Sequence, residues 1–235
     1  ALLGELKYLR SVWLARAPTH GDYRIREMVH LAGEKRSETV YKEHGCLFKV
    51  DITKVFITPR LNYEHLRVAS LVKPGEVIVN MFAGAGLFSI IIAKKAQPKI
   101  VYSIDINPDA YKYMVENIKL NKVEDKVVPY LGDAARVIEE HLVGVADRVL
   151  MPLPELALDY AIYALKALKA RGTIHFYLHI KALRGENPVA LAKNIVEARL
   201  NSLGASMEAS TGRIVRKVGP RTYQVVIDAK VAKQF

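Results

Sequence analysis

Cysteine and long apolar stretches are scarce in this sequence, and each shortage excludes a class of protein. Cys46 is the single cysteine among 235 residues, which excludes an internal disulfide and a cysteine-built metal cluster. No apolar run approaches the about 20 residues that a membrane-spanning helix needs, and no signal-peptide pattern opens the chain. We therefore expect a soluble, cytoplasmic protein in which Cys46 is a half-buried strand thiol.

Acidic side chains are outnumbered, since 24 Asp and Glu residues face 35 Lys and Arg residues and leave a formal charge of +11. Such an excess favours polyanionic partners through counterion release, although a basic surface without a function is the alternative. The acidic residues concentrate around 105–160, whereas basic residues crowd both ends: Arg10, Arg16, Arg24, Arg26, Lys35, Arg36, Lys42, Arg213, Arg216, Lys217 and Arg221. A basic flank on either side of a less basic core suits an enzyme that acts on RNA.

The first 60 residues predict a small α+β module. Leucines and Trp13 recur at helical spacing over 1–16, which indicates a helix that ends at the breaker segment 17–22. Three extended runs rich in β-branched and aromatic residues follow, at 23–32, 37–43 and 46–51. A helix over 61–72 then leads into a larger domain, which we expect to span 61–235.

The larger domain alternates short apolar strands with helices. The strands are expected at 76–80, 99–105, 126–130, 146–151 and 172–180, and the helices at 86–95, 108–121, 134–142, 155–169 and 188–203. This alternation predicts an α/β fold with a mostly parallel sheet and right-handed crossovers. Two adjacent strands turned at Gly219-Pro220 close the chain, which departs from a dehydrogenase-type Rossmann domain.

A glycine turn after the first strand of this domain is the strongest local signal. In VIVNMFAGAGLFSI (77–90), Gly84 and Gly86 let the backbone turn tightly and approach a ligand at the carboxyl edge of the sheet. Phe88 stands where the nicotinamide fingerprint G-x-G-x-x-G/A has its third small residue. The turn therefore disfavours a dinucleotide.

Two aspartates follow the next two strands. Asp105 can accept the hydroxyl hydrogens of a ribose, since ionised acceptors make strong hydrogen bonds, and Asp133 lies within reach of an adenine amino group. Both residues could instead cap the helices that follow, a reading that is compatible with binding. Together with the glycine turn, the three strand ends fit the methionine, ribose and adenine parts of S-adenosylmethionine.

Four segments together resemble the archaeal and eukaryotic tRNA methyltransferases that modify position 37, next to the anticodon. They are HLAGEKRSETVYKEHG (30–45), FKVDITKVFITPRLNYEHLRVA (48–69), MFAGAGLFSI (81–90) and MPLPE (151–155). The resemblance covers roughly residues 20–233. It implies a class I methyltransferase, Rossmann-like with a mostly parallel seven-stranded sheet, preceded by the small α+β module. It also implies S-adenosylmethionine as the cofactor and the anticodon loop of tRNA(Phe) as the partner.

The resemblance also implies roles for matching positions. Arg24 or Arg26 would stabilise negative charge on the exocyclic oxygen of the base, Glu64 would be the general base or would orient the base, and Pro152 and Pro154 would shape the floor beneath it. The cofactor would be lined by Phe56, Thr58, His65, Phe82, Gly84, Gly86, Asp105, Ile106, Asp133 and Ala134. Alternatively, Glu64 and Arg67 simply pair on their helix, and Arg24 contacts only phosphate. Candidate walls for an extruded base are Phe56, Tyr63, Phe82, Phe88 and Pro152.

Three departures from the family bear on the reaction. Guanine-N1 enzymes carry Asn-Leu-Pro or Asn-Pro-Pro after the fourth strand, whereas Pro152 takes the place of the Asn and offers no side-chain donor or acceptor. The Pro-Leu-Pro form resembles the wyosine branch, which methylates C7 of 4-demethylwyosine. His65 replaces an Arg found in many relatives. The chain also begins with one helix only, where full-length relatives carry a further domain, so we expect a short form or a trimmed one.

These observations favour methylation of 4-demethylwyosine at C7. The alternative is methylation of guanine at N1, either as the only reaction or in addition to the first. Transfer of an aminocarboxypropyl group from the same cofactor is a further alternative, although those enzymes tend to lack the Pro-Arg-Leu run at 59–61. A non-catalytic RNA-binding module with a vestigial pocket is the remaining one, and the intact glycine turn argues against it. We expect a monomer without a metal or a membrane partner.

Overall fold

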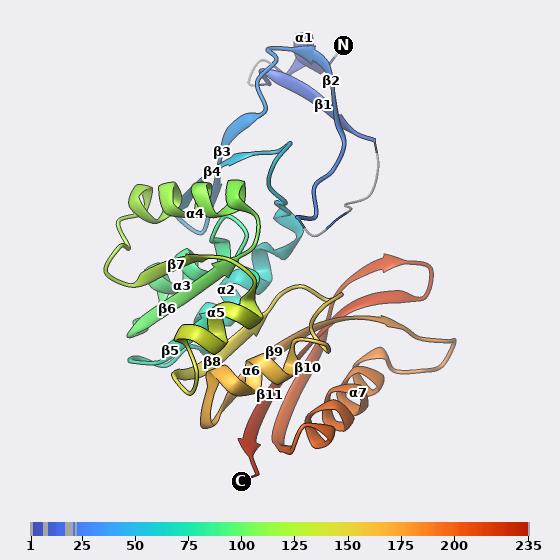
Figure 1. Ribbon diagram of the computed structural model, residues 1–235. Helices are drawn as coiled ribbons and strands as arrows, with labels where there is room; N and C mark the ends of the chain where they lie inside the picture. The colour runs from blue at the N-terminus through green and yellow to red at the C-terminus, as the bar shows by residue number, and fades with distance from the viewer. Residues whose placement is uncertain (1, 7–8, 17–20, 22, 235) are drawn as a thin grey trace.

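The structure is a computed structural model that describes residues 2–6, 9–16, 21 and 23–234. Its centre is a seven-stranded sheet in the order β10-β11-β9-β8-β5-β6-β7 (Figure 1). The strands are β5 (Val77–Asn80), β6 (Ile100–Asp105), β7 (Val127–Leu131), β8 (Ala146–Met151), β9 (Leu168–Lys181), β10 (Ala205–Gly219) and β11 (Thr222–Lys233). The first five are parallel, whereas β11 pairs antiparallel with β9 and β10 pairs antiparallel with β11. The expected α/β, mostly parallel fold is confirmed.

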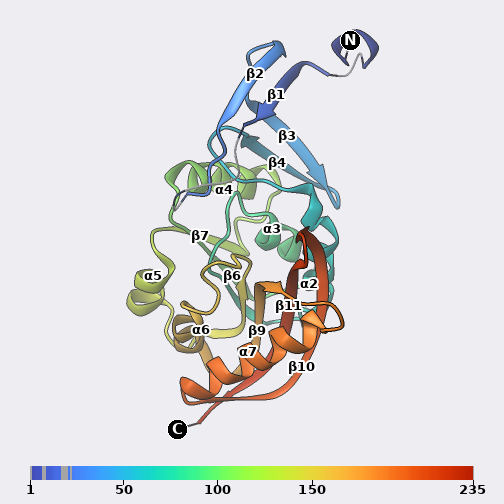
Figure 2. The same cartoon turned by 90° about the vertical axis from the view of Figure 1, so that its right-hand side faces the viewer.

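Helices cover both faces of this sheet (Figure 2). One core holds α2 (Asn62–Leu71), α3 (Leu87–Lys95) and α4 (Pro108–Leu120), and the other holds α5 (Ala134–His141), α6 (Ala161–Ala167) and α7 (Pro188–Ser202). Alternate strand residues face alternate cores, since Ile78 packs in the first and Val79 in the second. Strand order reverses between β5 and β8, which places the topological switch point at the centre of the sheet.

Two hairpins precede the sheet. The first pairs β1 (Ser11–Ala15) with β2 (Met28–Gly33) and lies at the far end of the molecule, and the second pairs β3 (Glu38–Glu43) with β4 (Cys46–Asp51) (Figure 1). Asn117 of α4 and Asn121, which follows this helix, hydrogen-bond the backbone of β4 at Lys49 and Leu47, respectively. β4 also contributes buried side chains to the α2–α3–α4 core. The second hairpin is thus joined to the large domain, and the predicted boundary at residue 60 stays a prediction.

The expectation of a helix over 1–16 is wrong. The described part of that segment holds one helical turn, α1 (Leu2–Glu5), followed by β1. Pairing with β2 overrides the helical spacing: Trp13 lies opposite His30 of β2, and the two rings meet edge-on with centroids 5.0 Å apart. β-propensity of Val and Trp adds to this pairing.

Three further details also differ from expectation. The run at 23–32 is a strand only from Met28, and the helix expected at 155–169 shortens to α6 because turns occupy 154–160. Leu168 and Lys169 begin β9 instead. Cys46 is fully buried at 1% exposure, because β4 packs inward against α3.

Candidate active site

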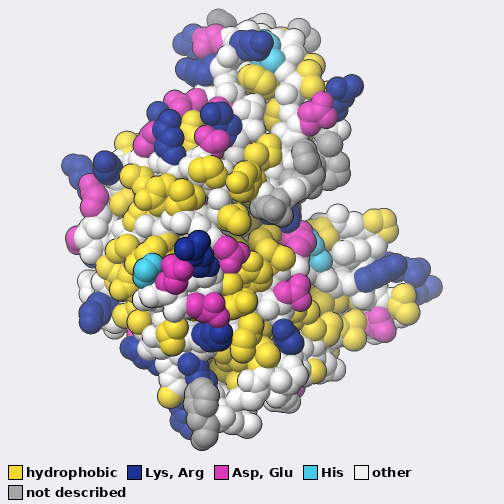
Figure 3. Space-filling model, in the orientation of Figure 1, with side chains coloured by type: hydrophobic (Ala, Val, Ile, Leu, Met, Phe, Trp, Pro, Cys, Tyr) yellow, Lys and Arg dark blue, Asp and Glu magenta, His cyan; other side chains and the backbone are white. Residues whose placement is uncertain are grey.

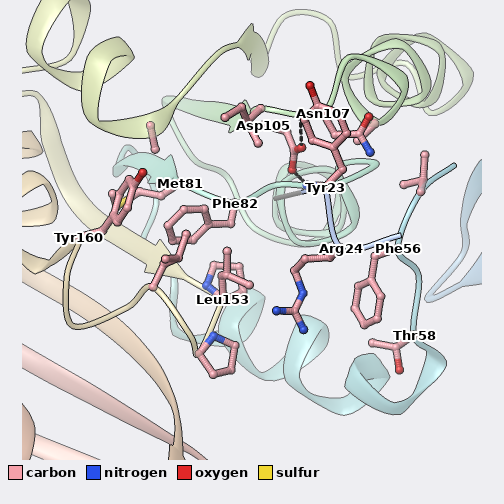
Figure 4. A pocket seen from close by; sticks show the side chains of 18 of the residues that line it. Tyr23, Arg24, Phe56, Thr58, Met81, Phe82, Asp105, Asn107, Leu153 and Tyr160 are labelled. Atoms are coloured by element: carbon pink, nitrogen blue, oxygen red, sulfur yellow. Dashed lines mark hydrogen bonds between the residues drawn. The ribbon is translucent and has the colours of Figure 1, made fainter. Parts of the chain in front are cut away.

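A cavity of about 400 Å³ opens where the parallel strands end, at the switch point of the sheet (Figure 4). This volume lies within the range of typical small-molecule sites, about 300–1,000 Å³. The carboxyl ends of β5, β6 and β7 form one end of the cavity, and the loop after β8 together with β9, β10 and β11 forms the other. Tyr23 and Arg24, which precede β2, complete the lining together with Val55, Phe56 and Thr58 between β4 and α2. We call the two ends the nucleoside end and the base end.

The glycine turn after β5 adopts the backbone conformation that its sequence predicts. Gly84 has φ +56° and Gly86 φ +91°, both in the left-handed region that favours glycine. A Cβ on Gly84 would meet open space, whereas one on Gly86 would lie about 3.1–3.2 Å from Ile90 and Met114. Gly84 lines the cavity, and Gly86 lets the turn pack tightly on α3 and α4 beneath it.

Asp105 ends β6 inside the nucleoside end. Its Oδ2 accepts the backbone N–H of Gly84 at 2.6 Å and its Oδ1 that of Asn107 at 2.9 Å. Burial raises the pKa of this carboxyl group, which the two backbone hydrogen bonds oppose. Asn107, not Asp105, caps α4, so the capping alternative does not account for Asp105. Each carboxylate oxygen keeps a further lone pair for a ligand hydroxyl.

Asp133 both caps a helix and lines the cavity. Its Oδ1 accepts from the backbone N–H of Ala135 in the first turn of α5 at 2.8 Å, and its Oδ2 accepts from the hydroxyl of Tyr160 at 2.5 Å. Ile106 and Ala134 supply apolar surface beside it. An apolar slot with a carboxylate at its rim fits an adenine ring, and Asp105 next to it fits the ribose. These residues therefore fit the nucleoside of S-adenosylmethionine.

The base end has apolar walls and a charged rim. Pro152, Leu153, Pro154 and Phe82 line it, as do Phe56 and Thr58 from the segment that leads into α2. Arg24 projects toward the cavity (Figure 4). Its Nη1 lies 2.8 Å from Glu155 Oε2, and its guanidinium lies 5.7 Å from the Phe56 ring centre. The segment before β2 is thereby tied to the loop after β8 across the cavity.

Glu64 and His65 are buried in α2 and do not line the cavity. The Glu64 carboxylate accepts a bidentate pair of hydrogen bonds from Arg67, a bond from Tyr177 at 2.9 Å and one from Arg213 of β10. His65 Nδ1 meets Glu43 Oε1 at 2.5 Å, and its ring packs edge-on against Phe88. The pairing of Glu64 with Arg67, one of the two readings of the sequence, is present in the structure.

Most of the predicted site residues converge on the cavity, and a few do not. The cavity is lined by Arg24, Phe56, Thr58, Phe82, Gly84, Asp105, Ile106, Asp133, Ala134, Pro152 and Pro154. Arg26 lies outside this lining but near it, with its guanidinium 5.8 Å from the Phe56 ring centre. Of the candidate walls, Tyr63 is exposed beneath Arg213 and Phe88 is core.

Several lining residues are not among those that the sequence predicts for the site. Tyr23, Met81, Asn107, Gly132, Leu153 and Tyr160 belong to the segments around the motifs, whereas His179, Arg216 and Gln224 come from the last three strands of the chain. Gln224 is the one amide among the apolar neighbours at 223–227 in β11, and this pattern could have indicated a site residue. His179 alternates with buried apolar residues in β9 but resembles any exposed strand residue.

The described residues contain neither a metal-binding cluster nor a membrane-spanning helix. No group of three or more His, Cys, Asp or Glu side chains there could hold a metal ion. Within the same part of the chain, no helix is long and apolar enough to cross a membrane.

Residues 39–203 match the family model described as the TRM5/TYW2 methyltransferase domain. The chain is 48% identical over 229 residues to the tRNA 4-demethylwyosine(37)-methyltransferase Taw21 of Saccharolobus solfataricus, covering 97% of this chain and 82% of that protein. It is 40% identical to the tRNA (guanine(37)-N(1))-methyltransferase Trm5b of Pyrococcus abyssi, covering 99% and 67%. A 4-demethylwyosine aminocarboxypropyltransferase of Methanocaldococcus jannaschii is 36% identical, covering 94% and 86%.

Solved structures agree with these relatives. Wild-type Trm5b from Pyrococcus abyssi superposes with a TM-score of 0.84 at 38% identity, covering 99% of this chain and 67% of that one. TYW2 of M. jannaschii in complex with AdoMet superposes with a TM-score of 0.77 at 35% identity, covering 88% and 90%. The expected class I methyltransferase fold is confirmed, and the chain belongs to the TRM5/TYW2 methyltransferase domain family.

Proposed function

We propose that the chain transfers the methyl group of S-adenosylmethionine to the nucleoside at position 37 of tRNA(Phe), and that C7 of 4-demethylwyosine is the preferred acceptor. Pro152 in the wall of the base end is the observation that carries this preference. It offers a flat apolar surface for a larger ring and no polar group for the guanine edge. The 48% identity to a 4-demethylwyosine methyltransferase supports the same preference.

The chain's own residues position the reactants. S-adenosylmethionine supplies an electrophilic methyl group on a sulfonium centre. Asp105 and Gly84 would hold its ribose and methionine parts, and Ile106, Asp133 and Ala134 its adenine. Alignment of two reactants in such a site can supply on the order of 7–11 kcal/mol of the barrier.

At the base end, charge and apolar surface have separate tasks. Arg24, fixed by Glu155, would stabilise negative charge on the exocyclic oxygen of the base. Phe56, Phe82 and Pro152 would exclude water from the extruded ring and hold it flat. We expect the enzyme to act as a monomer on the anticodon loop.

Methylation of guanine at N1 is the second candidate, since Trm5b relatives of this activity match almost the whole chain. Two tRNA(Phe) substrates separate the candidates, one with guanosine and one with 4-demethylwyosine at position 37. Label from S-adenosylmethionine in the tricyclic substrate alone supports the C7 assignment. Label in plain guanosine alone contradicts it, and label in neither contradicts the proposed function.

The substitution Pro152→Asn tests the role of that wall. It restores the polar group that guanine-N1 relatives carry, so we expect the ratio of guanosine to tricycle methylation to rise by about tenfold, the effect of roughly 1.4 kcal/mol of new hydrogen bonding. Pro74→Asn is the matched control, because Pro74 is exposed at the opposite edge of the sheet. An unchanged ratio in Pro152→Asn would show that this position does not set the preference.

A further inference from the structure

A row of three polar side chains crosses the base end on neighbouring strands. Gln224 of β11 lies directly opposite His179 of β9, and Arg216 of β10 lies directly opposite Gln224. Directly opposed residues point to the same face of a sheet, and all three line the cavity. The antiparallel end of the sheet thus presents one continuous polar edge to the space beside Pro152.

Gln224 is the most constrained member of this row. Its side chain is buried, at 2% exposure, beside the buried apolar residues 225–227 of the same strand. Arg216 Nε donates to Gln224 Oε1 at 2.6 Å. An arginine only donates, so this bond fixes the amide with its oxygen toward Arg216 and its NH₂ group away from it.

The amide nitrogen of Gln224 makes no hydrogen bond to the described part of the chain. It is nevertheless not cut off from solvent, unlike the buried side-chain atoms of that part that have no hydrogen-bond partner. It therefore faces the cavity as an oriented donor that lacks an acceptor. Within the cavity this N–H group can bond only water or a ligand, so a ligand acceptor that reaches it meets a donor whose direction is already fixed. The base end supplies the place for such an acceptor.

The two neighbours of Gln224, His179 and Arg216, make this polar edge suitable for an uncharged ring. Burial lowers the pKa of the His179 imidazole, and Arg216 and Arg24 lower it further against the raising effect of Glu155. The imidazole is therefore uncharged at neutral pH. Among the described residues no carboxylate pairs with Arg216, so its guanidinium serves the amide of Gln224.

We propose that Gln224, oriented by Arg216 and flanked by His179, reads the hydrogen-bonding edge of the target base in place of the side chain that Pro152 lacks. The inference rests on the proposed function, because it assumes a purine-derived base in the base end. The acceptor is a carbonyl oxygen or ring nitrogen of that base. Gln224 is thus a specificity-determining residue of the tRNA site, not of the cofactor site.

Binding to tRNA(Phe) with and without the base at position 37 tests this assignment. Two tRNAs are compared, one with 4-demethylwyosine and one abasic at that position, and their Kd ratio isolates the contribution of the base. Gln224→Glu keeps the shape and the bond from Arg216 but removes the NH₂ donor. We expect the ratio to shrink by about 10- to 100-fold, as expected for about 1–3 kcal/mol of base readout, with abasic binding and S-adenosylmethionine binding unchanged.

Two further variants complete the test. Gln97→Glu adds the same negative charge at the opposite edge of the sheet and should leave the ratio at its wild-type value. Gln224→Leu removes the donor without adding charge and should show the same decrease in the Kd ratio. This second variant keeps the test possible if Gln224→Glu does not fold. A wild-type ratio retained in a folded Gln224 variant overturns this inference alone. A wild-type protein that binds both tRNAs equally overturns the proposed function as well.

Discussion

The carboxylate of Asp105 is held in place by two backbone N–H groups, so its position is set before any ligand binds. Such preorganisation lets the carboxylate accept ligand hydroxyls without losing further side-chain freedom. Burial raises the pKa of Asp105 against the lowering effect of these two hydrogen bonds, so a ligand hydroxyl that donates to the carboxylate would further stabilise its ionised form.

Asp105→Asn should weaken S-adenosylmethionine binding. The amide keeps one acceptor and replaces the other with a donor that opposes the N–H of Gly84 or Asn107. Loss of charged hydrogen bonds of about 1.5–3 kcal/mol should raise Kd by about 10- to 100-fold in calorimetry. Asp147→Asn is the control, since Asp147 also accepts a backbone N–H, from Val77, but lies at the amino edge of the sheet. An unchanged Kd in Asp105→Asn would remove the ribose assignment.

Between elements, a chain of buried charged groups joins α2 to the sheet. Arg67 bridges Glu64 of its own helix and Asp228 of β11, with Nη1 2.5 Å from Asp228 Oδ2. Asp228 also accepts from His175 Nδ1 at 2.5 Å, and His175 Nε2 lies 2.7 Å from Arg148 Nη1. Arginine can only donate, so Nε2 is an acceptor and the His175 ring is neutral.

Arg67→Met should destabilise the fold strongly. It leaves two buried carboxylates short of their shared partner, and breaking a buried pair costs about 3–5 kcal/mol. We expect the free energy of unfolding in urea to fall by about 3 kcal/mol. Arg136→Met is the matched comparison, because Arg136 pairs with Glu140 on the surface of α5 and exposed pairs contribute little to stability. Equal losses in the two variants would contradict a central role for this network.

His175 gives the stability a pH dependence of defined sign. Burial lowers the pKa of His175 in the folded protein, and Arg148 and Arg67 add to this, although Asp228 opposes it. The unfolded chain therefore takes up a proton below about pH 6.5 that the folded protein does not. We expect the free energy of unfolding to fall by up to about 1.4 kcal/mol per pH unit from pH 6.5 downward.

The comparison that isolates this effect uses His175→Asn, whose amide nitrogen can still donate to Asp228. The free energy of unfolding of the wild type, taken relative to that of His175→Asn, should fall as the pH falls from 7 to 5. The depressed pKa of Asp228, which His175 and Arg67 lower against the effect of burial, adds a further loss only below its ordinary pKa near 4. If the wild type instead became more stable relative to His175→Asn as the pH falls, His175 would be charged in the folded protein.

Sequence patterns predicted the helices and strands that depend on local residues. They failed where pairing with a distant strand determines the secondary structure. The strands and helices from 76 onward follow apolar periodicity and short turns, so most bounds agree within a few residues. The segment 1–16 has helical spacing, yet pairing with β2 makes Ser11–Ala15 a strand. The same limit applies to the site. Gly84 stands in a recognisable glycine turn and Asp105 ends a predicted strand, whereas Gln224 reaches the cavity only because β11 pairs with β9.

At the scale of the whole molecule, two groups of basic side chains stand out among those spread over the surface (Figure 3). Figure 3 shows Lys and Arg side chains on the N-terminal hairpins and at the far end of the β10–β11 hairpin, with hydrophobic surface between them. Lys217 and Arg221 are exposed at that far end. An RNA strand that enters the cavity would pass between the two basic regions, which fits the net charge of +11.

Neutralising Lys217 and Arg221 together, each to Gln, should lower the salt dependence of tRNA binding. Each lost phosphate contact reduces the slope of log K against log salt by roughly 0.7–0.9, so we expect a reduction of about 1.5. Lys99→Gln at the amino edge of the sheet should leave the slope unchanged. Identical slopes in the double variant and the wild type would place the RNA on another face.

Mass spectrometry of the position-37 nucleoside tests the central claim most directly. tRNA(Phe) bearing 4-demethylwyosine is incubated with the protein and S-adenosylmethionine, digested to nucleosides and analysed for added mass. The account predicts a tricycle that has gained one methyl group on carbon C7. A gain of an aminocarboxypropyl group, or an unmodified tricycle beside a cofactor-binding protein, would contradict it.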